Sequence, residues 1–170
     1  DAPVKVFVLA GQSNMVGAGQ VKANPARHDG QGSLEWLVES SPMKARFSSL
    51  RDDQGNWVER EDVKIWNFGR TGGLKPGYGS NTGTIGPELG FGTVVGEAFD
   101  EPVLLIKIAW GGKSIGKDFR PPSAGGEVGP EYRILVDRTK EVLQDAGRQF
   151  PELAGRTFEL AGFGWHQGWN

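Results

Sequence analysis

A serine between two amide residues follows the first apolar run of the chain. Residues 4–9 read VKVFVL, and Gly11, Gln12, Ser13 and Asn14 come directly after Ala10. A serine just past a strand can present its hydroxyl to a cleft, with the next backbone N–H groups aimed at the same place, which suits attack on an ester carbonyl. Ser13 is therefore the candidate nucleophile, although an isolated Gly-x-Ser is more often only a strand-to-helix turn capped by serine.

Two other apolar runs end in groups of the same kind. Residues 103–109 lead into Trp110, Gly111 and Gly112, and residues 157–165 lead into His166 and Gln167. In open parallel sheets, ligands bind beyond the carboxyl ends of the strands. The glycines let a backbone N–H approach closely and Gln167 offers a carboxamide, so an oxyanion hole of Ser13, Gly111, Gly112 and Gln167 is predicted.

Neighbouring residues are weaker candidates for lining the substrate. They are Gln12, Asn14, Trp110 and His166. The tryptophans at 110, 165 and 169 have two equally good interpretations, because an aromatic ring near a site either stacks on a sugar or fills the core or its rim.

Several other chemistries do not fit the sequence. The Gly11 region lacks the spacing of a phosphate loop or a dinucleotide fingerprint, and Met15 replaces the final glycine of a Gly-x-Ser-x-Gly elbow. There is no cysteine, and no His/Asp/Glu cluster has metal-ligand spacing. The net charge of −2, with scattered Lys and Arg, gives no footprint for nucleic acid or an anionic membrane. Small-molecule or neutral-polymer partners fit better.

The elements that must position these groups follow an α/β pattern. Short, nearly uninterrupted apolar runs predict strands over 4–9, 103–109 and, more weakly, 157–165, with a further strand over 63–68 near an edge. Amphipathic spacing predicts a helix over 131–148, and a weaker helix is predicted over 87–99. Strand, helix and strand at this spacing imply right-handed crossovers and a mainly parallel sheet.

One domain over residues 1–170 is the natural count for this length. Residues 21–61 are polar and mixed, and we expect an excursion from the core, with LEWLVE its one helical turn. Residues 69–92 are dense in glycine and predict a long surface loop, either lining a cleft or serving only as a flexible connector.

No apolar stretch approaches the roughly 20 residues that span a bilayer. The chain begins DAPVKVF without Met, so either a leader has been removed or the given chain starts there. Secretion or a periplasmic location is a hypothesis only.

Four blocks in order resemble a known family. GQSNMVG, IGPELGFG, AWGGKSI and FGWHQGWN are similar to the successive blocks of the SGNH (GDSL-like) hydrolases, and more narrowly to the carbohydrate esterase family 6 and sialate O-acetylesterase branch, with bacterial acetylxylan esterases nearest. The resemblance runs from Val4 to the last residue. It implies a three-layer α/β/α sandwich that removes acetyl groups from sugar hydroxyls and needs no metal or organic cofactor.

The resemblance also implies roles for single residues. Ser13 would be the nucleophile and its own N–H an oxyanion donor, and Gly111 or its neighbour Gly112 would give the second donor. Gln167 would stand where many SGNH hydrolases have Asn and give the third. For Glu88, in the IGPELGFG block, we expect a structural role that holds the glycine-rich loop.

The sequence departs from the family at its catalytic acid and base. The family's Asp and His lie late in the chain, whereas the given sequence reaches Asn170 inside the HQG block. We expect the Asp and His beyond Asn170, with the remaining strands and a final helix. His166 should face away from Ser13 if Gln167 faces it, because neighbouring side chains in extended backbone point to opposite sides. A packing or substrate-lining role is thus expected for His166, and His28 is expected to be exposed.

The leading hypothesis is a serine esterase that deacetylates carbohydrate through a Ser13 acetyl-enzyme. Two alternatives stay open. One is a degenerate or non-catalytic module that keeps the sugar cleft, and the other is a different SGNH activity such as a lipase, thioesterase or arylesterase.

Overall fold

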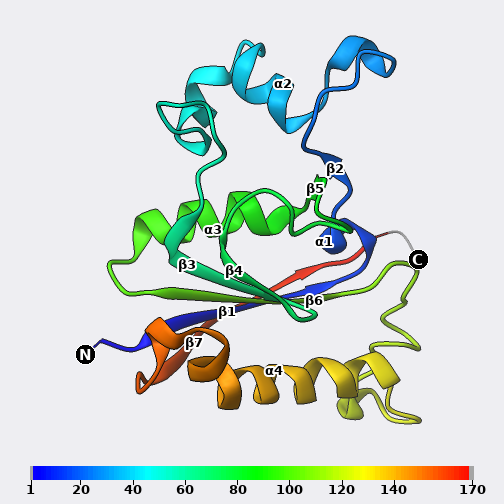
Figure 1. Ribbon diagram of the computed structural model, residues 1–170. Helices are drawn as coiled ribbons and strands as arrows, with labels where there is room; N and C mark the ends of the chain where they lie inside the picture. Colours follow the sequence, from blue (N-terminus) through cyan, green and yellow to red (C-terminus); the bar gives the residue numbers. More distant parts are fainter. Residues whose placement is uncertain (1, 169–170) are drawn as a thin grey trace.

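A five-stranded sheet forms the centre of the protein, as the computed structural model of the chain shows for residues 2–168 (Figure 1). Its strand order is β4-β3-β6-β1-β7. The strands are β1 (Val4–Gly11), β3 (Arg60–Asn67), β4 (Arg70–Leu74), β6 (Val103–Ala109) and β7 (Phe158–His166). Only β4 is antiparallel to its neighbour, so the predicted mainly parallel sheet is confirmed.

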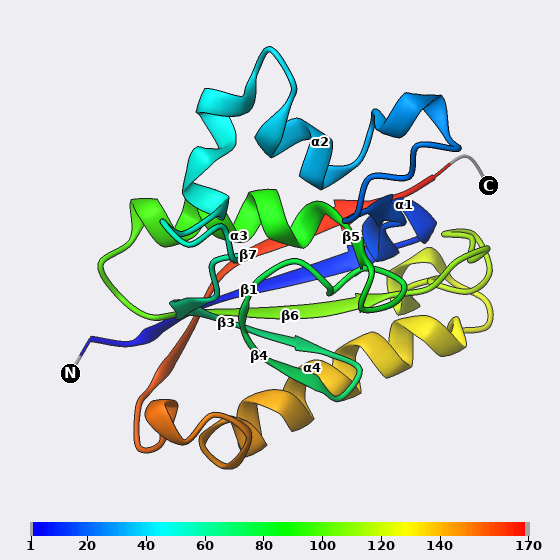
Figure 2. The ribbon, with the colours of Figure 1, turned by 45° about the horizontal axis from the view of Figure 1, so that its top comes forward.

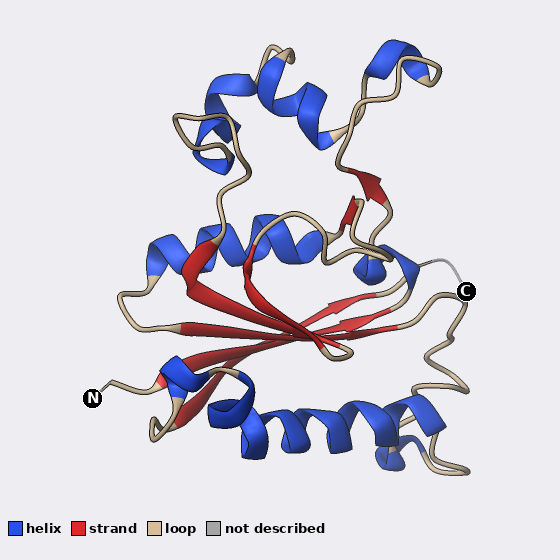
Figure 3. Ribbon diagram, in the orientation of Figure 1, coloured by secondary structure: helices blue, strands red, loops and turns tan. Residues whose placement is uncertain are grey.

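Helices cover the two faces of this sheet. Helix α3 (Pro87–Ala98) lies on one face and α4 (Pro130–Gln149) on the other, which gives the predicted three-layer α/β/α arrangement (Figures 1 and 3). Alternate residues of β1 serve the two layers. Val6 and Val8 belong to the core cluster under α4, and Phe7 and Leu9 belong to the cluster under α3. The uninterrupted apolar run of β1 therefore reflects burial on both faces.

The long helix α4 matches its sequence pattern closely. Pro130 occupies its first turn, and Leu135, Val142 and Ala146 are buried against the sheet. Proline is favoured at that position because the first N–H groups of a helix have no internal acceptor. In the described residues no helix is both long and apolar enough to cross a membrane.

The glycine-rich segment 69–92 differs from the predicted loop. It contains β4, the short strand β5 (Thr84–Ile85) and the first turns of α3, so β3 has a neighbour on its outer side and is not an edge strand. Close packing explains the glycines here better than flexibility does. A Cβ at Gly73 would lie 2.6 Å from the carbonyl oxygen of Arg60 on β3. Only the stretch between β4 and β5 is irregular, as predicted.

The predicted excursion 21–61 lies on the α3 side of the sheet and contains short helices joined by loops and turns (Figures 1 and 2). Its helical turn LEWLVE is α2 (Leu34–Glu39), capped by the Ser33 hydroxyl, which accepts from the Trp36 N–H. The excursion begins after β2 (Gly19–Gln20), which pairs with β5, and its last residues form the start of β3. The remaining short elements are η1 (His28–Gly30), η2 (Lys44–Leu50), η3 (Pro122–Ala124) and η4 (Pro151–Leu153).

A buried ion pair connects strand β6 of the sheet to helix α3. Lys107 on β6 and Glu88 on α3 are almost fully buried, and the Lys107 ammonium contacts Glu88 Oε2 at 2.5 Å. The same ammonium donates to the carbonyl oxygens of Val16 at 2.7 Å and Tyr78 at 2.8 Å. Burial lowers the pKa of Lys107, and the Glu88 charge acts in the opposite direction. Glu88 Oε1 accepts from the Gly86 N–H at 2.8 Å, so the expected role of Glu88 in holding this loop has a visible basis.

Removing one partner of this pair should destabilise the fold strongly. We expect Lys107→Met to lower the free energy of unfolding by about 3–5 kcal/mol, because the Glu88 carboxylate stays buried without its cation. Lys107→Met/Glu88→Gln should recover about half of that loss, since the glutamine oxygen can still accept from Gly86. Urea denaturation of the three proteins measures both effects.

Lys64→Met is a matched control. The Lys64 ammonium is also buried, but its partners Glu61 and Glu152 have largely exposed carboxylates. They remain solvated after the substitution, so this change should cost only about 1 kcal/mol of ion-pair energy in addition to any packing change. An equal loss in Lys64→Met and Lys107→Met would contradict the argument.

Candidate active site

The three predicted strand ends lie side by side in register. Gly11 at the end of β1 pairs with Ala109 on β6 and with His166 on β7. The residues that follow these three therefore leave the sheet at the same edge. The nucleophile candidate Ser13 comes from the central strand of the three, and the glycine pair and Gln167 come from its two neighbours.

Ser13 begins the four-residue helix α1 (Ser13–Val16) and is exposed. The N-cap of α1 is Gln12, and no side chain caps the helix. Among the described residues, neither the hydroxyl nor the N–H of Ser13 has a hydrogen-bond partner. The serine thus does not serve as the cap of its own turn, which was the structural alternative, and both groups are available to a ligand.

Glycines are required on both sides of α1. Gly11 has φ of +144°, and a Cβ there would lie 2.1 Å from the His166 carbonyl oxygen. Gly17 has φ of +82°, and a Cβ there would lie 2.1 Å from the Cα of Gly86. An L side chain would be both strained and obstructed at these positions. The chain therefore enters and leaves α1 through close backbone contacts that fix the helix against β7 and the start of α3.

Gly111 lies beside Ser13. A Cβ built at Gly111 would be 4.0 Å from the Ser13 Cβ, so a side chain at this position would project toward the nucleophile candidate. Gly112 has φ of +72° with open space around it, and both glycines are exposed. In the described part of the chain neither N–H has a backbone acceptor. Both amides are therefore available as the predicted oxyanion donors.

Gln167 is already engaged on one side. Its amide nitrogen donates to the Lys113 carbonyl oxygen at 3.0 Å, which ties the end of β7 to the loop that carries the glycine pair. An amide nitrogen has two hydrogens, so one donor remains for a ligand. The loop itself is held by the Lys113 ammonium, which contacts Glu131 at 2.5 Å and Asp118 at 3.7 Å. The role of Gln167 as third oxyanion donor stays a prediction.

The side chains of Gln12 and Asn14, on either side of Ser13, differ in exposure. Gln12 is almost fully buried, and a Cβ at Gly168 would lie 1.9 Å from its Oε1, so its side chain packs under the end of β7. Asn14 is exposed. Of these two predicted lining residues, only Asn14 presents its side chain to solvent.

The histidines and tryptophans take several positions. Trp110 and Trp165 are half-buried and both pack against the Phe119 ring, with centroid separations of 5.7 and 4.8 Å. Their core role is therefore visible, and sugar stacking stays a prediction. His166 is exposed, and its imidazole makes no hydrogen bond to the described residues. His28 is exposed in η1, and Trp169 lies outside the described residues.

Sequence reasoning missed Lys107 as part of the site. Its ammonium is buried and binds the Val16 carbonyl oxygen at the last residue of α1. Lys107 is thus a positioning residue for the helix that begins with Ser13. A lysine inside the otherwise apolar strand VLLIKIA was the available signal, because a buried lysine needs specific partners.

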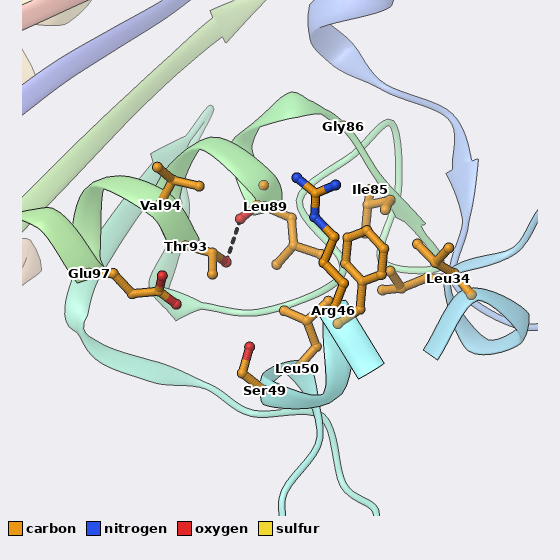
Figure 4. Close-up of a pocket in the computed structure, with 13 residues that line it drawn as sticks. Leu34, Arg46, Ser49, Leu50, Ile85, Gly86, Leu89, Thr93, Val94 and Glu97 are labelled. Atoms are coloured by element: carbon orange, nitrogen blue, oxygen red, sulfur yellow. Dashed lines mark hydrogen bonds between the residues drawn. The ribbon is translucent and has the colours of Figure 1, made fainter. Parts of the chain in front are cut away.

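An apolar pocket of about 390 Å³ lies between the excursion and α3 (Figure 4). Leu34, Phe47 and Leu50 line it from the excursion, and Leu89 and Val94 line it from α3. None of the predicted site residues lines this pocket, so the candidate active site and this apolar pocket are separate places.

Comparison with solved structures identifies a similar fold. A crystal structure of an Arabidopsis thaliana protein matches with a TM-score of 0.56 and 18% sequence identity over 98% of this chain. The match covers 58% of the plant protein, so the chain spans little more than half of that protein's length. At this identity the likeness concerns the fold alone. A search of curated protein sequences gives no match.

A family model described as carbohydrate esterase, sialic acid-specific acetylesterase, matches residues 3–170. This match covers nearly the whole chain and agrees with the resemblance to the sialate O-acetylesterase branch of the SGNH hydrolases. The chain therefore belongs to the carbohydrate esterase family of sialic acid-specific acetylesterases.

Proposed function

We propose that this chain is a serine esterase that removes O-acetyl groups from carbohydrate, such as acetylxylan or another acetylated sugar, through an acetyl-enzyme on Ser13. The observation that carries this proposal is the exposed Ser13, whose hydroxyl and amide have no partner in the described residues, beside the free amide of Gly111. Membership in a carbohydrate esterase family supports the class of reaction.

The geometry suits acyl transfer in two steps. The Ser13 oxygen attacks the acetyl carbonyl and loses its proton to a base, and the carbonyl oxygen gains negative charge. The backbone N–H groups of Ser13 and Gly111 would stabilise that charge, together with the second hydrogen of the Gln167 side-chain amide. The C–O bond to the sugar then breaks, and the sugar oxygen takes a proton. Water later attacks the acetyl-enzyme and releases acetate and Ser13.

The base for this reaction is not among the observed contacts of Ser13. Neither His28 nor His166 hydrogen-bonds to the Ser13 hydroxyl in the described residues, and the family resemblance places the catalytic Asp and His late in the chain. This observation favours one second candidate function, a module that binds acetylated sugar without turning it over. Measured acetate release separates the two functions.

Ser13→Ala should abolish esterase activity. We expect acetate release from acetylated xylan, and hydrolysis of 4-nitrophenyl acetate, to fall by about 10³-fold or more, because the alanine cannot form the acetyl-enzyme. Ser33→Ala removes a serine hydroxyl that caps α2 and should leave the specific activity of the folded protein unchanged. Equal rates for Ser13→Ala and the unaltered chain would remove Ser13 from the mechanism. Binding of acetylated sugar without any hydrolysis would favour the binding module.

Gly111→Ala should lower activity without lowering stability. The added methyl group would lie near Ser13, where the substrate acetyl group must enter, and it has no backbone clash. We expect kcat/KM for 4-nitrophenyl acetate to fall about tenfold, with the free energy of unfolding changed by no more than about 0.5 kcal/mol.

Gly116→Ala is the control for this change, because Gly116 lies in the same loop with open space around it. It should keep both the activity and the stability of the unaltered chain. If Gly111→Ala and Gly116→Ala have the same kcat/KM, Gly111 does not border the reacting group.

A further inference from the structure

The β3–β4 turn holds an aromatic residue where one is disfavoured. Asn67 pairs with Arg70, so Phe68 and Gly69 form a two-residue hairpin loop (Figure 2). Both have positive φ, +47° for Phe68 and +82° for Gly69, which is the pattern of a type I′ turn. The first position of such a turn favours Asn, Asp or Gly, and a bulky residue there is a true outlier. Folding alone would select a smaller residue than Phe68.

The Phe68 ring packs against two other aromatic rings and is partly exposed to solvent. Its centroid lies 5.2 Å from that of Trp110 and 5.8 Å from that of Trp66. The residue nevertheless stays 44% exposed, unlike the aromatic residues of the core. Trp110 directly precedes Gly111, so the Phe68 ring stands next to the strand end that supplies the predicted oxyanion donors.

A cavity of about 240 Å³ opens beside this ring. Phe68 and Arg70 line it from the hairpin, Ser80 from the glycine-rich segment, and Val16 from α1. Val16 is the last residue of the helix that begins with Ser13. The cavity is smaller than the roughly 300–1,000 Å³ of sites for drug-sized ligands, which suits a single ring.

Arg70 gives this cavity unused hydrogen-bond donors. Its two terminal nitrogens donate to the carbonyl oxygens of Gly77 at 2.9 Å and Gly79 at 2.6 Å. A guanidinium has five N–H groups, so donors remain, and no carboxylate of the described residues pairs with it. A cavity with one aromatic wall and a few fixed donors matches a sugar ring, which has a C–H face and hydroxyls at its rim.

We propose that this cavity is a binding subsite for one sugar ring of the acetylated carbohydrate. The C–H face of the ring lies on Phe68, and its hydroxyls accept from Arg70 and bond to Ser80. This inference rests on the proposed function, since it assigns the sugar part of the same substrate. It also gives a reason for the strained position of Phe68, because strain of this kind persists where it serves a site.

The test uses Phe68→Asn, which removes the ring and places a favoured residue in the turn. Affinity for acetylated xylo-oligosaccharide is measured by calorimetry on Ser13→Ala, which cannot turn the sugar over, with and without Phe68→Asn. We expect at least a tenfold weaker affinity with Phe68→Asn. In chains that keep Ser13, the ratio of kcat/KM for the oligosaccharide to kcat/KM for 4-nitrophenyl acetate should also fall at least tenfold. Phe68→Tyr keeps the aromatic face, so it should keep most of the affinity and most of the kcat/KM ratio of the chain with Phe68.

Phe163→Asn is the matched control, because Phe163 is an exposed aromatic residue on β7 that does not line the cavity. It should keep the affinity and the kcat/KM ratio of the unaltered chain. Unchanged values in Phe68→Asn, an equal loss in Phe163→Asn, or no binding by the Ser13→Ala chain would overturn the subsite. If the unaltered chain hydrolyses neither ester, the esterase function fails, and the affinities still decide the subsite.

Discussion

A single buried ammonium group holds the helix that presents Ser13. Helix α1 is one turn long, and so short a helix is not stable from its own hydrogen bonds. Lys107 supplies what α1 lacks by binding the Val16 carbonyl oxygen, and it binds Glu88 and the Tyr78 carbonyl oxygen with its other protons. The ammonium therefore connects β6, α1, α3 and the glycine-rich segment. The position of the exposed serine depends on a charge that lies wholly inside the molecule.

Backbone packing sets the other limits of the site. Gly11 touches the β7 backbone and Gly17 touches Gly86, so α1 is confined at both ends by contacts that only glycine permits. Gln167 then binds the loop after β6 through the Lys113 carbonyl oxygen. The segments that carry the predicted donors are thus held by neighbouring strands, and an oxyanion hole that is fixed in advance stabilises charge without reorganisation.

The sequence predicted the elements whose pattern is local. The apolar runs of β1, β6 and β7 and the periodicity of α4 gave their bounds to within a few residues, and the shared ends of parallel strands brought Ser13 and Gly111 together. The strand β4 was missed, because its glycines reflect close contact with β3, and such contact is not visible in a one-dimensional pattern. Lys107 was missed because its partners come from segments distant in the sequence. The burial of Gln12 likewise depends on where the end of β7 passes.

At Phe68, near the candidate active site, the chain does not have the residue that the β3–β4 turn favours. Aromatic packing against Trp66 and Trp110 is worth about 0.5–1.5 kcal/mol for each pair, and a strained backbone residue costs about 1–3 kcal/mol. The two terms are of similar size, so the pairing of the rings does not by itself outweigh the strain of the turn. Asparagine at this position would avoid the strain, yet it would leave the cavity beside Trp110 without an aromatic wall. A residue that is strained in its turn and 44% exposed beside Trp110, which precedes the predicted oxyanion donors, is better explained by contact with a ligand than by the needs of the fold.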